Sequence, residues 1–450
     1  MRIAHYFLGF PPYRTGGLTK YAYDLMISQR EEGNELFAFW PGRISPINRR
    51  IYFKETIKPE GIISIEIINS LPVSLDEGIK AVDAYTKGTN KNEILEYLRR
   101  INPDVIHIHT LMGLHKEFVD AAKSLNIKTI YTTHDYFGIC PKVTLYRNGE
   151  TCDNDQGCQV CIMCNIKALS LRKIELLQSP LYRNLKNSNT IRALRKRHRQ
   201  HFFEEDATWS GPKGFQVTQH DAAKYRELRA YYKTILETID LIHFNSSLTK
   251  EVFERYISPN RSTVISITHK NVKDNRQNRS KKWNGKLSIT CLAPARPYKG
   301  FDVLRSALDE LWEEGKRFFE LRVYSPVKNP APYMIINEDG FNQSELQTIF
   351  GMSDVLIAPS IWYETFGFTV LEALSYGVPV IVSDHMGSKD IIGSAGIVIS
   401  AGNVCELKDS IISMYESKCA PYAHCVNDNN IVIKSWDTHV KELTGLYQWK

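Results

Sequence analysis

Short apolar runs alternate with longer amphipathic stretches over most of this chain of 450 residues. In the first half the short runs predict buried strands and the longer stretches predict helices. The predicted strands are residues 2–9, 35–41, 104–110 and 128–135, and the first predicted helix covers residues 19–33. Strands that alternate with helices indicate parallel βαβ units in an open, doubly wound sheet.

The second half repeats the same alternation. Its predicted strands are residues 286–294, 319–326, 354–360, 378–384 and 395–400. Residues 269–285 are polar, basic and nearly without apolar positions, which is typical of a linker. We therefore expect two α/β domains that face one another, residues 1–272 and 283–428, and a C-terminal helix in 429–450 that packs back on the first domain.

Residues 140–235 interrupt this alternation. They hold a group of cysteines followed by long polar stretches of helical character. We interpret them as an insertion in the first domain.

Composition narrows the class of protein. With 43% hydrophobic and 11% aromatic residues, a chain of this length buries a large core and is globular. The 57 Lys and Arg against 50 Asp and Glu give a net charge of +7, which favours small anionic ligands over nucleic acid. No apolar run is long enough to span a membrane, and prolines soon break the N-terminal segment. Neither a membrane span nor a signal peptide is expected, and the predicted location is cytoplasmic.

Loops directly after strands are the first places to look for chemistry, because ligands of open α/β sheets bind beyond the carboxyl ends of the strands. Gly16 and Gly17 precede the first helix, where backbone amides can approach an anion; an ordinary βα turn is an equal alternative. His134, at a strand end, can donate to a sugar hydroxyl or a phosphate. His107 and His109 share one face of a strand. His109 is expected to reach the ligand crevice, and His107 is interpreted as structural.

In the second half, Arg296 and Lys299 lie in a loop between a strand and a helix. Two cations at this spacing suit a diphosphate, because arginine offers a planar fork and lysine a mobile point charge. A solvated pair of charges is the alternative.

Two glutamates flank the start of a later helix in the stretch YETFGFTVLEALSYG. Glu364 precedes the helix and Glu372 lies about one and a half turns inside it, so the two do not form an i, i+4 pair. The backbone amides around Phe366 and Gly367 lie at the helix N-terminus, where a phosphate is favoured. Glu372 suits a ribose diol, as acidic residues do in dinucleotide sites.

The order of these motifs resembles a known family. E-T-F-G-F-T-V-L-E-A-L, with S-D-V-L-I-A-P-S and R-P-Y-K-G before it, follows an N-terminal G-G loop, P-D-V-I-H-I-H, T-H-D and N-S-S-L-T-K. This arrangement is similar to that of the retaining glycosyltransferases of the GT-B fold, family four. The resemblance covers most of the chain apart from the insertion. It implies two Rossmann-like, doubly wound domains that face a central cleft.

The resemblance also implies roles for the candidate residues. Glu364 would contact the transferred sugar and Glu372 the ribose. The other implied donor-side residues are Gly16, Gly17, Thr365, Phe366 and Gly367 near the sugar and diphosphate, His134 beside the donor sugar, and Arg296 and Lys299 on the leaving nucleoside diphosphate. No catalytic metal is expected, because the cations and helix N-termini stabilise the departing charge. A diphosphate oxygen would take the acceptor proton, so Glu364 is not a nucleophile of the glycosidase type.

The implied function is transfer of a sugar from a nucleotide-diphosphate sugar to a hydroxyl of a glycan or lipid-linked glycan. Surface polysaccharide synthesis, of O-antigen or capsule, is the expected setting. The alternative is a non-catalytic relative that binds a glycan or stabilises a partner. The presence of both glutamates and both cations favours the enzyme.

Three segments depart from the family pattern. They are Ala293-Pro294-Ala295 before the cationic loop, Tyr324-Ser325-Pro326 in place of a glycine-rich turn, and His269 to Lys273 in place of the usual hinge sequence. These departures bear on donor-base recognition and domain closure more than on the reaction class.

The insertion contains Cys140, Cys152, Cys158, Cys161 and Cys164. Two overlapping C-x2-C steps and two further thiols suffice for a tetrahedral zinc site of four thiolates, with one thiol to spare. A related cysteine cluster occurs in a subset of the family. Reduced free thiols and an iron-sulfur cluster are the alternatives.

A basic stretch follows the cysteines. Residues 167–199 contain ten Lys or Arg and one acid, Glu175. A solvated face is the leading interpretation. The alternative is a surface for anionic lipid head groups, each basic residue contributing about 1 kcal/mol near the bilayer, with peripheral membrane association.

Overall fold

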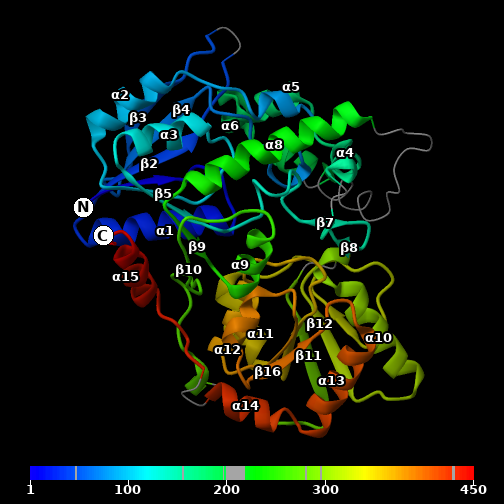
Figure 1. Ribbon diagram of the computed structural model, residues 1–450. Coiled ribbons are helices and arrows are strands. Elements are labelled where there is room, and N and C mark those ends of the chain that lie inside the picture. Colours follow the sequence, from blue (N-terminus) through cyan, green and yellow to red (C-terminus); the bar gives the residue numbers. More distant parts are fainter. Residues whose placement is uncertain are drawn as a thin grey trace.

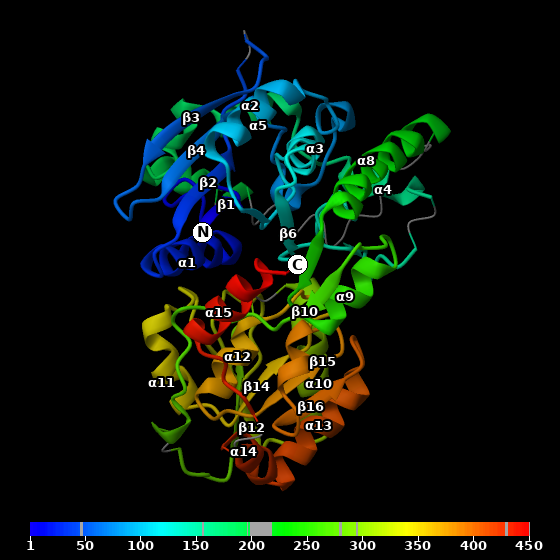
Figure 2. The same cartoon turned by 60° about the vertical axis from the view of Figure 1, so that its left-hand side comes forward.

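The computed structural model describes residues 1–45, 48–154, 157–195, 197–198, 218–278, 281–293, 296–427 and 431–449. The chain forms two α/β bodies, one above the other, each built on a largely parallel sheet (Figures 1 and 2). The predicted class of two Rossmann-like domains is thereby confirmed. Residues 199–217 of the expected insertion, Pro294 and Ala295 of the altered loop, and residues 428–430 at the expected boundary of the C-terminal helix lie outside the described residues.

The N-terminal sheet has eight strands in the order β10-β9-β6-β5-β1-β2-β4-β3. The strands are β1 (Arg2–Tyr6), β2 (Glu35–Pro41), β3 (Tyr52–Ile57), β4 (Ile63–Ile68), β5 (Val105–Ile108), β6 (Lys128–Thr132), β9 (Leu241–Phe244) and β10 (Ser262–Val264). All neighbours are parallel except the edge pair β3 and β4. The register places His5 of β1 opposite His107 of β5.

Helices cover this sheet, and a small hairpin lies beside it. The helices are α1 (Gly17–Glu31), α2 (Lys91–Ile101), α3 (Lys116–Ser124), α4 (Gln159–Asn165), α5 (Leu171–Gln178), α6 (Pro180–Leu185), α8 (Gln219–Thr238) and α9 (Ser247–Glu254), and the hairpin joins β7 (Tyr146–Arg147) to β8 (Glu150–Thr151). Helix α8 contributes Tyr225, Tyr232 and Leu236 to the hydrophobic core. The expected end of the insertion near residue 235 falls inside this core helix, whose charged outer face makes its sequence look polar.

The C-terminal sheet has six parallel strands in the order β13-β12-β11-β14-β15-β16. The strands are β11 (Leu287–Cys291), β12 (Phe319–Val323), β13 (Met334–Ile336), β14 (Val355–Ala358), β15 (Val380–Ser383) and β16 (Gly396–Ile399). The helices are α10 (Phe301–Glu313), α11 (Leu346–Gly351), α12 (Phe368–Ser375), α13 (Val404–Glu416) and α14 (Ala420–Asn427). Two hydrophobic clusters pack on this domain's elements.

In each sheet the strand order reverses beside the first strand, so later strands lie on both sides of it. In the C-terminal sheet β12 and β13 lie on one side of β11, and β14, β15 and β16 lie on the other. The loops after β11 and β14 therefore flank a topological switch point, where open sheets bind their ligands. In the N-terminal sheet the corresponding loops follow β1 and β5.

The last helix, α15 (Trp436–Leu446), returns to the N-terminal domain (red in Figure 1) and lies between the two bodies in Figure 2. It begins at Ser435, whose side chain accepts a hydrogen bond from the Thr438 amide. Trp436 and Leu443 share one buried cluster with Tyr21 of α1 and with Phe366 of the C-terminal domain. The two domains and the C-terminal helix therefore share a hydrophobic contact.

Among the described residues, no helix is both long enough and apolar enough to cross a bilayer. Apart from β2, which has its predicted bounds, the strands are shorter than the apolar runs that predict them, since 104–110 becomes Val105–Ile108 and 354–360 becomes Val355–Ala358. The final residues of each run turn into the loops that form the candidate site. The predicted set did not include β3, β4, β7, β8, β9, β10 and β13. Of these, β3 is a largely exposed edge strand with charged residues, so it lacks an apolar run.

Candidate functional site

The loops after β11 and β14 bring a cation and a carboxylate into contact. Nζ of Lys299 lies 2.7 Å from Oε2 of Glu364, and the indole Nε1 of Trp362 lies 3.4 Å from the same oxygen. The Lys299 ammonium also lies 4.8 Å from the centroid of the indole ring. The two charged side chains are largely buried, with 16% and 22% of their surfaces exposed. The pair is therefore held in one position between the loop and the ring.

A glycine lets the cationic loop approach so closely. Gly300 has a φ of 75°, and a Cβ on it would lie 1.7 Å from the carbonyl oxygen of Pro359. The short helix η4 (Pro297–Lys299) precedes it, and the Tyr298 carbonyl accepts hydrogen bonds from the amides of Ile361 and Trp362 at 3.0 and 3.1 Å. The two loops are thus joined through their backbones, which explains why Lys299 and Glu364 meet.

Arg296 lies at the start of the same loop. Its Nη1 donates to the hydroxyl of Tyr298 at 2.6 Å, and its guanidinium carbon lies 5.9 Å from the ring centroid. Lys299 Nζ lies at the same distance, 5.9 Å, from that ring. Both predicted cations therefore border Tyr298.

The segment from Glu364 to Gly367 is tied to the turn after β15. The Gly387 amide donates to the Glu364 carbonyl at 2.9 Å, and the Ser388 amide donates to the Phe366 carbonyl at 2.7 Å. Gly367 has a φ of 96° and begins α12; a Cβ there would lie 2.4 Å from Cε of Met386. The positive φ favours glycine at this turn, from which α12 begins.

Thr365 connects the two domains. Its carbonyl accepts hydrogen bonds from Oγ of Ser246 at 2.7 Å and from Oγ1 of Thr249 at 3.0 Å. Its own hydroxyl donates to the carbonyl of His134 at 3.2 Å. The structure therefore brings the backbone of His134 in the first domain next to the E-T-F-G segment of the second.

Glu372 is buried, with 7% of its surface exposed. Its Oε1 accepts from Nε2 of His269 and from Nε2 of Gln343, both at 3.1 Å. The imidazole of His269 also packs edge-on against Phe368, with centroids 5.1 Å apart. Sequence reasoning placed His269 only in an altered hinge and did not connect it with Glu372. The departure from the family pattern was the available signal, because the hinge contacts this carboxylate.

Gly16 and Gly17 lie at the N-terminus of α1 and are exposed. Gly16 has a φ of 128°, and a Cβ on either residue would meet no atom within 4 Å. The side of the turn on which a Cβ would lie is therefore open.

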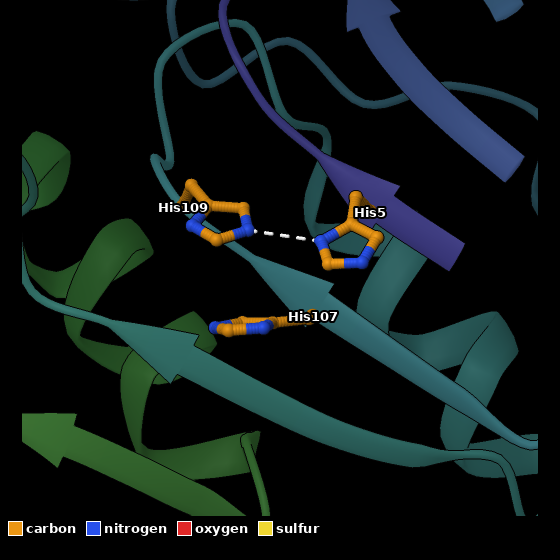
Figure 3. A group of neighbouring side chains, drawn as sticks. All are labelled: His5, His107 and His109. Atoms are coloured by element: carbon orange, nitrogen blue, oxygen red, sulfur yellow. Dashed lines mark hydrogen bonds between the residues drawn. The ribbon is translucent and has the colours of Figure 1, made fainter. Parts of the chain in front are cut away.

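His134 begins a hydrogen-bonded chain that runs through the interior of the first domain. The chain passes through His134, His109, His5, Gln29, Tyr447, His107, Thr132 and His243 and ends at the carbonyl of Ile265. Figure 3 shows three of its members: His5 on β1, His107 on β5 and His109 directly after β5. His109 is fully buried between His5 and His134. It was expected to reach the crevice itself, but its side chain is fully buried and its Nδ1 is hydrogen-bonded to His134.

The direction of this chain follows from its end. A carbonyl only accepts, so Nε2 of His243 must donate to Ile265, at 2.8 Å. Burial lowers the pKa of His243 to about 4, so the ring is neutral and its Nδ1 accepts the proton of the Thr132 hydroxyl, at 2.9 Å. Thr132 must then accept from Nε2 of His107, at 2.7 Å.

The same logic continues toward the candidate site. Nδ1 of His107 accepts from the Tyr447 hydroxyl at 2.7 Å, and that oxygen accepts from Nε2 of Gln29 at 3.0 Å. The Gln29 carbonyl oxygen is then left for Nε2 of His5, at 2.8 Å. Each of these protons has one possible direction.

The last two steps assign the tautomer of His134. Nδ1 of His5 accepts from Nε2 of His109 at 3.0 Å, and Nδ1 of His109 accepts from Nε2 of His134 at 3.3 Å. Burial lowers the pKa of His5 to about 4 and that of His134 to about 3, so these rings are neutral. His134 therefore carries its proton on Nε2 and a lone pair on Nδ1. It was expected to donate to a ligand; the network makes it an acceptor.

His5, His107 and His109 could also be considered as metal ligands, since one nitrogen of each lies within 4.8 Å of the others (Figure 3). All six of their ring nitrogens, however, already have hydrogen-bond partners in the chain. A metal would have to break that chain. The hydrogen-bonded arrangement accounts for the cluster without an ion.

The five predicted cysteine ligands gather around the small hairpin and α4. Cys140, Cys158 and Cys161 are buried, and Cys152 and Cys164 are partly buried. A contact with the Cys161 thiol lowers the pKa of Cys158, and burial raises the pKa of Cys164 to about 12. Within the described residues, no three of these sulfurs lie within 4.8 Å of one another. Thiol sulfurs are suitable ligands for zinc, but in this structure the sulfurs lie too far apart to coordinate one ion together.

The cysteine segment also touches the candidate site. Oδ1 of Asp153 accepts from the Tyr363 hydroxyl at 2.7 Å and from Nη1 of Arg255 at 2.9 Å. Tyr363 is the neighbour of Glu364 in the loop after β14. The segment therefore braces the loop that carries the candidate carboxylate.

Comparison with known proteins shows two family matches. Residues 15–150 match the model described as Glycosyltransferase Family 4, and residues 339–430 match the model described as Glycosyl transferases group 1. These regions contain Gly16, Gly17 and His134 in one case and Glu364 to Glu372 in the other.

Two curated relatives match part of the chain. A glycogen synthase of Bacillus cytotoxicus is 28% identical over 118 residues, which cover 23% of this chain and 23% of that protein. An uncharacterised 41.2 kDa protein in the cps region of Klebsiella pneumoniae is 28% identical over 133 residues, covering 28% of this chain and 37% of that protein. The match thus spans well under two thirds of either relative.

A solved structure covers the full length. The α,α-trehalose-phosphate synthase (UDP-forming) from Burkholderia xenovorans, in complex with glucose-6-phosphate, is 10% identical with a TM-score of 0.57. The similarity covers 100% of both chains. At this identity the likeness concerns the fold.

Proposed function

Because the chain belongs to the glycosyltransferases of the family 4 and group 1 type, we propose that it transfers a sugar from a nucleotide-diphosphate sugar to a hydroxyl of a glycan or lipid-linked glycan with retained configuration. The contact between Lys299 and Glu364, beside the N-terminus of α12 and joined through Thr365 to His134, carries this proposal. The proposal assigns this cation, this carboxylate, the first amides of α12 and the His134 imidazole to one donor site.

In the proposed reaction the bond from the anomeric carbon to the diphosphate breaks, and the acceptor hydroxyl oxygen bonds to that carbon on the same face. A diphosphate oxygen takes the hydroxyl proton. Lys299 and Arg296 stabilise the charge that develops on the leaving nucleoside diphosphate, and so do the first amides of α12. Glu364 and the unprotonated Nδ1 of His134 accept hydrogen bonds from the sugar hydroxyls.

Glu372 is proposed to bind the ribose of the donor. The bonds from His269 and Gln343 both end on Oε1 and hold the carboxylate in place. Oε2 lies outside those two bonds and would accept from the diol. His269 belongs to the segment that joins the domains, so donor binding and interdomain geometry share one residue.

The acceptor is proposed to be anchored at a membrane. Four leucines, Leu176, Leu181, Leu185 and Leu194, expose between 47% and 64% of their surfaces and lie among the cations of the basic stretch. Exposed apolar side chains among lysines and arginines are typical of surfaces that lie on anionic bilayers. A peripheral location at the inner face of a cell membrane, in surface polysaccharide synthesis, fits this surface. The similarity to a protein of a cps region supports that setting.

We also propose that four of the five cysteines hold a structural zinc ion. Thiolates are the ligands that zinc prefers in such sites. The ion would stiffen the segment that braces Tyr363 through Asp153.

The experiment for the donor site is thermal unfolding in the presence of nucleoside diphosphates and nucleotide sugars. A ligand bound only by the folded state raises Tm. We expect one base to raise Tm, and Glu372→Ala to abolish that shift. The anomeric configuration of the product, followed by proton NMR, then tests retention. Absence of a shift with every nucleotide would contradict the proposal and favour a binding subunit.

A further inference from the structure

A second group of cations lies in the first domain, around Tyr13 in the loop after β1. The guanidinium carbons of Arg14 and Arg183 each lie 4.7 Å from the centroid of the Tyr13 ring, and Nζ of Lys186 lies 5.7 Å from it. Arg183 belongs to α6 and Lys186 directly follows it. We call Tyr13, Arg14, Arg183 and Lys186 the Tyr13 cluster.

The neighbourhood of the cluster is aromatic and largely shielded from water. The Arg183 guanidinium also lies 4.9 Å from the ring centroid of Trp40. Its Nη1 donates to Oε1 of Glu66 at 2.6 Å, and the two side chains expose only 16% and 13% of their surfaces. The Glu66 carboxylate therefore binds only Nη1 of the Arg183 guanidinium and leaves Nε and Nη2 for another partner.

Several donors of the cluster have no acceptor among the described residues. Nε of Arg14 and both Nε and Nη2 of Arg183 are buried without a hydrogen-bond partner in the part of the chain that the structure describes. A buried N–H without an acceptor costs free energy, and more so when it is charged. Three such donors beside one aromatic ring indicate that an anion completes the site.

Electrostatics points the same way. Lys186 is 7% exposed and donates to the backbone carbonyls of Tyr13 and Pro12. Burial, together with the positive charges of Arg195 and Arg14, lowers its pKa to about 8. The acids that face this group are Glu66, already bound to Arg183, and Glu77, whose charge acts on Tyr182. Four cations thus face two acids, and an anion would relieve their mutual repulsion.

The position of the cluster connects it with the acceptor. Tyr13 and Arg14 follow β1, Trp40 lies near the end of β2 and Glu66 lies in β4, so the cluster sits beyond the carboxyl ends of the strands. Gly16 and Gly17 belong to the same loop as Tyr13. Ligands of such sheets bind at this edge.

We infer that the Tyr13 cluster binds a phosphate or diphosphate group of the acceptor substrate. Two arginine forks and one ammonium match the oxygens and the charge of a phosphate, and tyrosine and tryptophan rings hold the forks in plane. The inference rests on the proposed function, because it specifies the acceptor of the same reaction. The phosphate can belong to a lipid in the bilayer or to a soluble sugar phosphate.

Equilibrium dialysis with radiolabelled inorganic pyrophosphate tests this site at low ionic strength. We expect two sites per chain, one at the donor loop and one at the Tyr13 cluster. Arg14→Gln and Arg183→Lys should each weaken one site about tenfold, the usual effect of losing a charge-assisted hydrogen bond. Lys299→Ala should weaken the other. Arg49→Gln, an exposed arginine outside the cluster, is the matched control and should leave both sites unchanged.

The outcomes separate the two proposals. If Arg14→Gln and Arg183→Lys bind pyrophosphate like the unaltered protein, while circular dichroism shows them folded, the inference is overturned and the donor proposal stands. If the Lys299→Ala variant alone keeps two sites, the donor assignment fails and the Tyr13 cluster stands. Arg14→Gln and Arg183→Lys are both mild substitutions, so weaker binding in both is not explained by a folding defect in one of them.

The source of the phosphate is distinguished by competition. Phosphatidylcholine vesicles that carry a polyprenyl diphosphate, and soluble glucose-6-phosphate, are each used to displace pyrophosphate from the cluster. Displacement by the vesicles alone assigns a lipid-linked acceptor, and displacement by glucose-6-phosphate assigns a soluble one. Failure of both to displace pyrophosphate from the intact cluster would overturn its assignment to the acceptor.

Discussion

The hydroxyl of Tyr447 donates to Nδ1 of His107 across 2.7 Å, although the two residues are 340 positions apart in the chain. Tyr447 follows the C-terminal helix, and His107 lies in the middle of the N-terminal sheet. The same hydroxyl accepts from Gln29. It is therefore the one link in the buried chain that the last residues of the protein supply.

Tyr447→Phe should loosen the tautomer of His134. The Tyr447 hydroxyl passes the direction of the hydrogen bonds from His107 to the Gln29 amide. Without this hydroxyl the amide can flip, and a mixture of ring tautomers becomes accessible along His5, His109 and His134. Nitrogen NMR of histidine-labelled protein should show the His134 Nδ1 signal moving from the unprotonated position toward an averaged one.

The lost hydrogen bond should also lower the free energy of unfolding by about 1 to 3 kcal/mol. Tyr415→Phe, which removes a phenol from the C-terminal domain, is the matched control. An unchanged His134 signal in Tyr447→Phe would show that the chain does not set the tautomer.

Removing the loop cation should reduce turnover far more than it reduces stability. Lys299→Ala removes the charge that faces Glu364 and, in the proposed complex, the leaving diphosphate. We expect kcat to fall by about two to three powers of ten, as with other losses of preorganised charge stabilisation. Steady-state kinetics with the donor found by thermal shift would measure this. Lys316→Ala, which changes an exposed lysine of the same domain, should behave like the unaltered protein.

The buried neutral histidines should make this protein less stable in mild acid. Burial lowers the pKa of His5 and His243 to about 4 and of His134 to about 3, whereas the unfolded chain takes up these protons near pH 6.5. The free energy of unfolding should therefore fall as pH drops from about 6.5 to about 4, by about 1.4 kcal/mol per pH unit for each imidazole, and should be insensitive to them above that range.

Urea unfolding at a series of pH values measures this slope. His243→Asn should make the dependence shallower, and His220→Asn, at an exposed position, should not. Parallel curves for both variants would contradict the prediction.

Gly300 should tolerate no side chain. Gly300 and Gly315 have nearly equal φ values, 75° and 78°, so an alanine is strained by about 1 kcal/mol at either position. At Gly315 a Cβ meets open space, whereas at Gly300 it meets the Pro359 carbonyl. Gly300→Ala should therefore lose more than about 3 kcal/mol of stability and most donor binding. Equal losses in the two variants, measured by urea unfolding, would show that the close contact is unimportant.

The zinc proposal predicts one zinc per chain in protein purified without chelator, measured by inductively coupled plasma mass spectrometry. Cys161→Ser should lose the metal, and Cys419→Ser, a buried thiol of the other domain, should keep it. Zinc-free protein with all thiols reactive would support the free-thiol alternative. Iron and sulfide in place of zinc would support a cluster.

Local patterns predicted the frame of the candidate site but not its long-range partners. The strand, glycine turn and helix around Gly367 are encoded within a few residues, so the positions of Glu364 and Glu372 could be predicted. The contact of Glu372 with His269 joins segments 103 positions apart. Nothing in either segment alone indicates the other.

The histidine chain was equally hidden. His107 and His109 stood out by their alternation, but His5 and His243 looked like isolated residues in apolar strands. Their relation depends on the order of β1, β5, β6 and β9 in the sheet, which periodicity does not determine. Helix α8 was assigned to the insertion instead of the core. Its buried residues are separated in the sequence by charged residues, so the sequence looks polar.

The return of α15 to the first domain has a consequence for biosynthesis. A ribosome releases the strands of the N-terminal sheet well before it has made Trp436 and Tyr447, which complete that domain's buried contacts. The nascent first domain must therefore persist with an uncovered apolar face and an unfinished row of imidazoles while the entire second domain is translated. Of the two domains, the one that is translated first is therefore the last to mature.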